Sequence, residues 1–185
     1  MKYQDLSLYR TPKGFRGRNI FWVQAWRTVQ ATLWRHSPKF AFGFRRLLLK
    51  AFGAKVGRNA QFSPSSTVTY PWFLETGEYC WIGDESVVYN LAKIYIGNNV
   101  ALAHRVYLCT GSHDIGSVAF EIEAKEVFLS DEVWLANDVF VMPGITIERG
   151  VVVAARSTVL ENLKEGGVYG GSPAKFIRYR KLGEE

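Results

Sequence analysis

The fold is decided by residues 129–159, which read LSDEVWLANDVFVMPGITIERGVVVAARSTV. An aliphatic residue stands at every sixth position of this stretch, at Leu129, Leu135, Val141, Ile147, Val153 and Val159. Ile96, Leu102 and Leu108 keep the same interval earlier in the chain. A period of six matches neither an α-helix, with a period of about 3.6, nor a single β-strand, with a period of about 2. It indicates an internal repeat, and such a repeat determines the architecture.

Each six-residue repeat, or hexad, combines a short β-rich run with a tight corner. The apolar residue is followed by a small one, such as Gly97 or Ala136, and then by turn residues such as Asn98-Asn99 or Asp131-Glu132. A chain of this kind coils, and successive coils stack at roughly 4.8 Å. No single coil buries its apolar face alone. A β-sandwich would need longer strands with turns every 8–12 residues or so. We therefore predict an all-β parallel solenoid.

The repeat occupies only part of the chain. We predict an N-terminal, partly helical segment over 1–53, a solenoid over 54–165 and a basic C-terminal tail over 166–185. Asn19 is placed to cap a helix over 20–35 that ends at Ser37-Pro38, and a second helix over 39–52 stops at Gly53. The repeat breaks at about 114–127, where the chain must leave the solenoid as an outward loop.

Charge is segregated along the chain. Of the net charge of +6, residues 1–74 carry +12, from 13 basic residues and one acidic residue, and the remainder carries −6. In the N-terminal segment, Trp and Phe alternate with Arg and Lys. This pattern is typical of a helix at a membrane interface, but aromatic residues also cap the open end of a solenoid. We expect both roles for residues 19–52. Nucleic acid is not an expected partner, because no nucleic-acid-binding module is recognisable.

Cysteine content and hydropathy limit the compartment. Cys80 and Cys109 form neither a disulfide framework nor a CxxC metal pair. The first residues lead into no apolar signal sequence, and no run of 18 or so apolar residues could span a bilayer. We expect a cytoplasmic protein, peripheral at the inner face of the membrane.

Several motifs resemble a known family. The hexads IGNNVA (96–101) and VAARST (153–158) are similar to those of hexapeptide-repeat acyltransferases. The further motifs YPW (70–72), YCWIG (79–83), CTGSHD (109–114) and GSPAK (171–175) look like those of colanic-acid-type polysaccharide O-acetyltransferases. This resemblance extends over nearly the whole chain. It implies a left-handed parallel β-helix, a homotrimer, and acetyl-CoA as the acyl donor.

Three histidines are candidates for the base that acyl transfer to a hydroxyl requires, since an imidazole titrates near neutral pH. His36 lies between the two expected helices and is expected on the surface. His104 occupies a corner of its hexad and should point to solvent. His113 closes its hexad at the mouth of the expected loop. The resemblance implies that His113 is the general base and that the acceptor attacks the thioester directly, without an acyl-enzyme.

The resemblance also assigns the remaining site residues. It places Asn90 against the acceptor, and Asp114 is a candidate for orienting the imidazole. The residues assigned to acetyl-CoA are Trp134, Asn137, Ala155, Lys175 and Arg178. Small residues would let the pantetheine arm lie against the coils, and cations would bind its phosphates. Two positions depart from the family: Glu161 replaces a lysine and Ser172 an asparagine.

The predicted function is acetyl-CoA-dependent O-acetylation of a sugar hydroxyl, on a surface polysaccharide or its lipid-linked precursor. Two other functions remain open at this stage. A metal enzyme similar to γ-type carbonic anhydrases needs three histidines, whereas the solenoid holds only His104 and His113. A non-catalytic scaffold at the membrane would use the helical segment alone.

Overall fold

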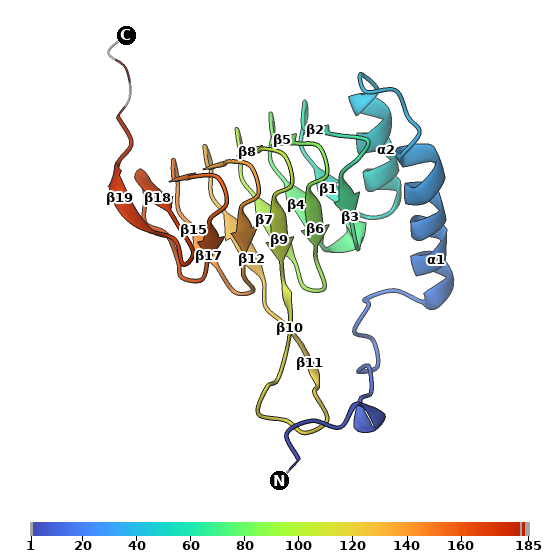
Figure 1. The fold of residues 1–185 in the computed structure, drawn as a ribbon. Coiled ribbons are helices and arrows are strands. Elements are labelled where there is room, and N and C mark those ends of the chain that lie inside the picture. Colours follow the sequence, from blue (N-terminus) through green and yellow to red (C-terminus); the bar gives the residue numbers. More distant parts are fainter. Residues whose placement is uncertain (1, 182, 184–185) are drawn as a thin grey trace.

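The computed structural model describes residues 2–181 and 183 and forms a β-solenoid with two helices at one end (Figure 1). Its strands form three faces. Face A contains β1 (Lys55–Val56), β4 (Leu74–Thr76), β7 (Ile94–Ile96), β12 (Val127–Leu129) and β15 (Thr146–Ile147). Face B contains β2 (Gln61–Phe62), β5 (Trp81–Ile82), β8 (Ala101–Leu102), β13 (Trp134–Leu135), β16 (Val152–Val153), β18 (Gly167–Gly170) and β19 (Lys175–Tyr179). Face C contains β3 (Thr67–Val68), β6 (Val87–Tyr89), β9 (Tyr107–Cys109), β14 (Phe140–Val141) and β17 (Thr158–Val159).

The hexad residues form the predicted interior column. On face B, Ile82, Leu102, Leu135 and Val153 pair in parallel register from coil to coil. All four are buried, as are the corresponding residues of faces A and C. The predicted parallel solenoid is thus confirmed.

The corners explain the rest of the hexad pattern. The fourth residue of most hexads has a positive φ, for example +55° at Asn99, +62° at Glu132 and +61° at Asp138. A left-handed conformation costs a residue with a Cβ about 1–2 kcal/mol. Glycine avoids this cost, and Gly144 and Gly150 occupy the same position with φ of +82° and +69°.

The N-terminal helices cover the first coil. Helix α1 (Ile20–Val29) is capped by the Asn19 side chain, which accepts a hydrogen bond from the Trp22 amide, as predicted. It continues as a π-helical turn over Gln30–Trp34, so the expected helix over 20–35 is not α-helical throughout. Helix α2 (Phe42–Ala51) begins later than expected, because Pro38 starts a turn in which its carbonyl accepts from the Ala41 amide.

Backbone polarity explains why tryptophan and arginine gather there. Neighbouring coils exchange backbone hydrogen bonds in both directions, as the Ser63 amide donates to Ile82 and the Tyr79 amide to Arg58. The first coil therefore has carbonyls and amides that face the N-terminal end without a coil to pair with, and its Val68 amide donates to Gln30 Oε1 at 2.7 Å. Indole and guanidinium groups only donate, and they satisfy these carbonyls. The bonds run from Trp26 to Val68, Trp34 to Ser66, Arg45 to Phe62 and Arg46 to Ala60, at 2.6–3.0 Å. The predicted capping role is confirmed for the buried Trp26 and Trp34.

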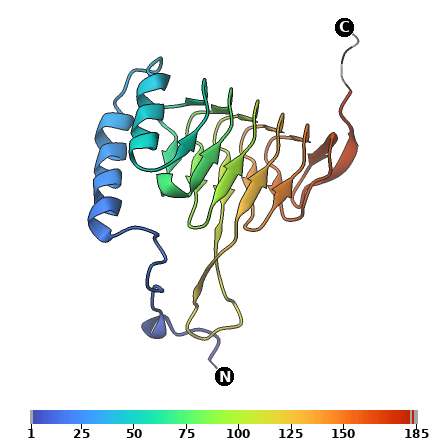
Figure 2. The ribbon, with the colours of Figure 1, turned by 180° about the vertical axis from the view of Figure 1, so that it is seen from behind.

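A hairpin interrupts the coils between faces C and A. Strands β10 (Gly111–His113) and β11 (Ile122–Ala124) pair antiparallel and project from the solenoid (Figure 1). The stack itself continues in register, because Ile96 pairs with Leu129 directly. The N-terminal residues, including a 3-10 turn at Leu6–Leu8, lie beside the hairpin tip in both views (Figure 2), and the Asp5 amide donates to the Val118 carbonyl.

The C-terminal end closes differently. Strand β18 adds to β16 in parallel, and β19 turns back antiparallel on β18. The segment predicted as a basic tail therefore includes a strand that carries Lys175 and Arg178 along face B.

Candidate functional site

The hairpin holds His113 at the outer end of its paired strands, where the loop begins. His113 pairs with Ile122 across the two strands, and its half-buried ring stacks on Phe120 with centroids 4.0 Å apart. Nδ1 lies 2.8 Å from the Phe120 carbonyl oxygen. Because a carbonyl only accepts, Nδ1 carries a proton in this bond, and in the neutral ring Nε2 is then left with its lone pair. The arrangement can therefore take a proton at Nε2.

The Asp114 carboxylate, a candidate for orienting the imidazole, is hydrogen-bonded within the hairpin turn. The carboxylate accepts a hydrogen bond from the Gly116 amide at 2.8 Å, and the Asp114 carbonyl accepts from the Ser117 amide. These bonds shape the turn of the hairpin. The orienting partner of the imidazole is the backbone carbonyl of Phe120, which no side-chain motif in the sequence indicates.

Asn90 lies at the corner below the hairpin and is fully buried. Its Oδ1 accepts from the Tyr70 amide at 2.9 Å and its Nδ2 donates to the Tyr70 carbonyl at 2.7 Å. Both ends of the amide thus join two successive coils. This placement gives Asn90 a structural task and directs neither polar atom toward His113.

The other two histidines lie at the surface, as predicted. His36 is exposed and its Nδ1 contacts the Thr32 carbonyl oxygen. His104 is exposed at its corner, with Nε2 4.0 Å from the Asp84 carboxylate. No group of three or more His, Cys, Asp or Glu side chains is arranged to hold a metal ion within residues 2–181 and 183.

The five residues assigned to the donor lie on or beside face B. Trp134 is on β13, Lys175 and Arg178 are on β19, and Asn137 and Ala155 are exposed at the corners that follow β13 and β16. Lys175 forms an exposed ion pair with Glu161, Nζ to Oε1 at 3.4 Å. The structure therefore brings these five residues together along one face.

His113 is not among them. It projects from the corner between faces C and A, which is opposite face B in a three-sided coil. One chain therefore presents its candidate base and its candidate donor residues on different sides.

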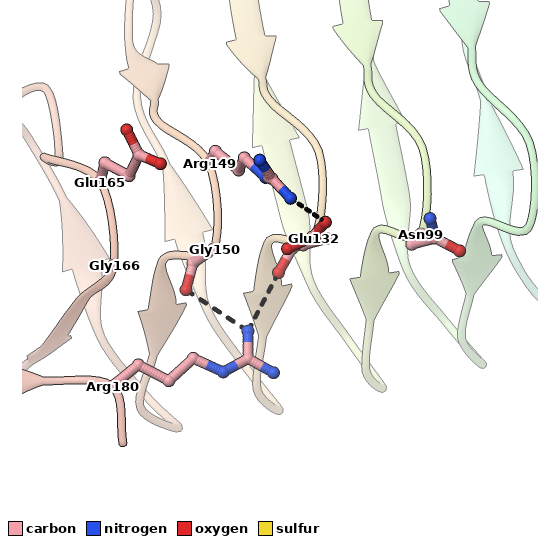
Figure 3. A pocket seen from close by; sticks show the side chains of 7 residues that line it. All are labelled: Asn99, Glu132, Arg149, Gly150, Glu165, Gly166 and Arg180. Atoms are coloured by element: carbon pink, nitrogen blue, oxygen red, sulfur yellow. Dashed lines mark hydrogen bonds and ion pairs between the residues drawn. The ribbon is translucent and has the colours of Figure 1, made fainter. Parts of the chain in front are cut away.

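A cavity of about 450 Å³ lies at another corner, where Arg180 reaches back across three coils (Figure 3). Arg180 donates to the Glu132 and Gly150 carbonyls, and Arg149 pairs with the Glu132 carboxylate at 2.7 Å. This cavity contains none of the predicted site residues, and its arginines already have partners.

Solved structures with the same fold define the class. A hexapeptide-repeat acetyltransferase from Vibrio cholerae, solved with acetyl-CoA, matches with a TM-score of 0.76 and 25% identity, over 86% of this chain and 89% of that one. A galactoside acetyltransferase in complex with coenzyme A matches with a TM-score of 0.81 and 23% identity, over 92% and 84%. The chain has the fold of the hexapeptide-repeat acetyltransferases.

Sequence comparison identifies the particular family. The putative colanic acid biosynthesis acetyltransferase WcaF of Escherichia coli is 48% identical over 177 residues, which is 96% of this chain and 97% of that protein. A galactoside O-acetyltransferase of Escherichia coli is 26% identical over 146 residues, 77% of this chain and 72% of that protein. A scan against protein-family models finds no match. The chain belongs to the colanic-acid-type acetyltransferases, so the resemblance seen in its motifs is confirmed and the protein is an acetyltransferase.

Proposed function

We propose that the protein transfers an acetyl group from acetyl-CoA to a sugar hydroxyl in surface-polysaccharide biosynthesis, with His113 as the general base. The observation that carries this proposal is the Nδ1 bond to the Phe120 carbonyl, which leaves Nε2 able to accept a proton. Nearly full-length similarity to a putative colanic acid acetyltransferase supports the substrate class. The acetyl-CoA complex of a structural relative supports the donor.

The chemistry is a direct transfer. Nε2 of His113 takes the proton of the acceptor hydroxyl while its oxygen attacks the thioester carbonyl. The carbon–sulfur bond then breaks, and the proton passes to the leaving thiolate. The stack on Phe120 and the carbonyl bond fix the ring, so little ordering is required of it when the acceptor arrives.

The acting form is a homotrimer, with the donor held between adjacent copies. Support comes from the separation in one chain between His113 and face B, because a rotated copy can bring its own imidazole to that face. On face B, Trp134, Asn137 and Ala155 offer a wall for the pantetheine arm. Lys175 and Arg178 offer charge for the phosphates.

A complementation experiment tests base and trimer together. His113→Ala should lower the rate of acetyl transfer to methyl pyranosides, followed as free thiol, by about 10²–10⁴-fold, and His36→Ala should not. A Trp134→Ala variant should bind coenzyme A more weakly by calorimetry. When His113→Ala and Trp134→Ala chains are co-expressed, about a quarter of the interfaces regain both residues and activity reappears. An undiminished rate in His113→Ala would remove the base, and no recovery in the mixture would place the site within one chain.

We further propose that residues 19–52 contact the inner membrane face, where a lipid-linked acceptor would lie. Phe21 and Phe40 are 83% and 82% exposed, Leu47 is exposed as well, and Lys39 and Lys50 lie among them at the surface. None of the helices in the described part of the chain is both long and apolar enough to cross a bilayer.

Vesicle sedimentation tests this contact. The protein should sediment with vesicles containing phosphatidylglycerol, less so at high salt, and a Phe21→Ser, Phe40→Ser double variant should lose this binding. Ile115→Ser, which removes an exposed apolar residue from the hairpin, is the matched control. Equal recovery of the double variant and the control would contradict the proposal.

A further inference from the structure

Two tryptophans form the walls of a slot on face B. Trp81 of β5 and Trp134 of β13 each pair in register with Ala101 of β8, which lies between them. Their side chains are 61% and 48% exposed. Side chains on a strand stand roughly perpendicular to the sheet. The two indoles therefore rise from one face with only a methyl group between them.

The slot between the two indoles forms a cavity. This cavity of about 230 Å³ is lined by Trp81, Gly83, Ala101, Leu102, Ala103, His104, Trp134 and Asn137. Gly83 leaves no room for a side chain here, because a Cβ at this position would lie 2.5 Å from the Ala103 carbonyl oxygen of the next coil.

The width admits one ring. Trp81 and Trp134 are two strand spacings apart, about 9.6 Å. One ring between two indoles requires two van der Waals separations, about 7–8 Å, and two stacked rings require three, about 10.5–12 Å. A single puckered ring fits, and a stacked pair does not.

The rim is polar. The Asn137 Oδ1 accepts from the His104 amide at 3.1 Å, and the His104 imidazole lies 4.0 Å from the Asp84 carboxylate. Aromatic walls with hydrogen-bonding groups at the edge match a pyranose, whose faces carry C–H groups and whose edge carries hydroxyls. The adenine of coenzyme A is also flat enough for the slot, but it is covalently linked to phosphates. The cations Lys175 and Arg178, which would bind those phosphates, lie three strand spacings beyond Trp134, about 14 Å away. A pyranose is therefore the better match.

The slot and the hairpin lie at the same level along the solenoid axis. The hairpin leaves after β9 and returns at β12, between the coils that carry Ala101 and Trp134. Rotation about an axis parallel to the solenoid keeps this height, so His113 of a neighbouring copy would reach face B level with the slot.

We propose that this slot binds the pyranose ring of the acceptor and that Trp81 forms its outer wall. This assignment rests on the proposed function, in which the donor lies along face B. Trp81 would hold the sugar, and the reacting groups would be the donor thioester and the imidazole of His113.

Fluorine NMR on protein labelled with 5-fluorotryptophan tests binding without catalysis. The six tryptophans give six signals, and Trp81→Phe and Trp134→Phe assign two of them. Methyl β-D-galactopyranoside should shift these two signals saturably, and glycerol, as a polyol control, should not. If neither signal moves up to the solubility of the sugar, the proposal is overturned. Coenzyme A binding to the same sample reports on the proposed function separately.

Variants separate the slot from the donor site. Trp81→Ala should weaken sugar binding by about tenfold and leave coenzyme A affinity unchanged, whereas Trp134→Ala should weaken both. Phe128→Ala is the matched control, because it removes an exposed aromatic ring from face A. Loss of coenzyme A affinity in Trp81→Ala would reassign the slot to the donor. Dissociation of the oligomer in that variant would make Trp81 a subunit contact, and either result overturns the proposal.

Discussion

Replacing Arg45 by methionine removes the most buried charge that closes the first coil. The guanidinium is fully buried and its partners are neutral. Nε donates to the Phe62 carbonyl at 2.6 Å, and Nη1 donates to the Ser37 hydroxyl at 2.6 Å. The carbonyls of Pro38 and Lys39 accept at 2.9 and 2.7 Å. Methionine keeps much of the aliphatic stem and none of the donors.

The expected loss follows from two opposing terms. The carbonyl of Phe62, a fully buried residue, loses its donor at a cost of about 1–3 kcal/mol. Pro38 and Lys39 are exposed, so water can replace the donor at their carbonyls. Burial lowers the pKa of the Arg45 guanidinium, and removing the charge returns part of that desolvation cost. We expect a net loss of about 2 kcal/mol, which for a chain of this size lowers Tm by about 4–8 °C.

Thermal unfolding followed by circular dichroism measures this change. Protein concentration must be equal for all variants, because unfolding of an oligomer depends on it. Arg27→Met, on the exposed surface of α1, is the control and should leave Tm nearly unchanged. If Arg45→Met unfolds within a degree or so of the control, the first coil does not depend on donors from the helices, and the account of the capping is refuted.

Three further predictions concern the coils and the hairpin. Gly83→Ala should destabilise the protein by about 1–3 kcal/mol, because the new Cβ would lie 2.5 Å from a carbonyl oxygen of the next coil; in Gly116→Ala the nearest atom is 3.2 Å away, and equal Tm values for the two variants would argue against this packing. The Ser63 hydroxyl, followed by a second serine and nearby cations, lowers the pKa of Asp84. Its ionised form therefore stabilises the fold above the ordinary carboxyl pKa of about 3.9, and this contribution is lost as pH falls through the lowered pKa. The Tm difference between wild type and Asp84→Asn should shrink below about pH 4, and a constant difference would contradict this linkage. Phe120→Ala keeps the carbonyl and removes the stacked ring, so kcat should fall by less than in the histidine variant while KM for acetyl-CoA stays constant; a rise in KM alone would show that the ring contacts the donor.

The solenoid could be predicted because its signal is long and periodic. Most hexads repeat an inward apolar residue and the same kind of corner, and the positive φ at Asn99 and Glu132 shows why Gly and polar residues are frequent at position four. The packing of the N-terminal helical segment on the solenoid is less predictable. Nothing local in the sequence distinguishes a buried Trp34 from an exposed Phe40, since the difference depends on which carbonyls of the first coil face each side chain.

The candidate site also contains residues that the sequence indicates and residues that it does not. His113 could be singled out, because the break in the repeat marks it. Its partner Phe120 could not, because that contact depends on antiparallel pairing across a turn, and the group used is a backbone carbonyl. At Asn90 the sequence indicates a sugar contact, because the residue type suits one. In this structure the side chain is buried and both of its polar atoms are hydrogen-bonded to Tyr70 of the preceding coil.

The hairpin leaves and re-enters the stack at one corner, and Ile96 meets Leu129 as though nothing lay between them. Its length is therefore uncoupled from the geometry of the prism. Closing a longer excursion costs little more than closing a short one, so residues can be added or exchanged at the tip without disturbing the interior. Such an insertion point would let selection reshape the choice of acceptor in descendants of this enzyme while the scaffold stays the same.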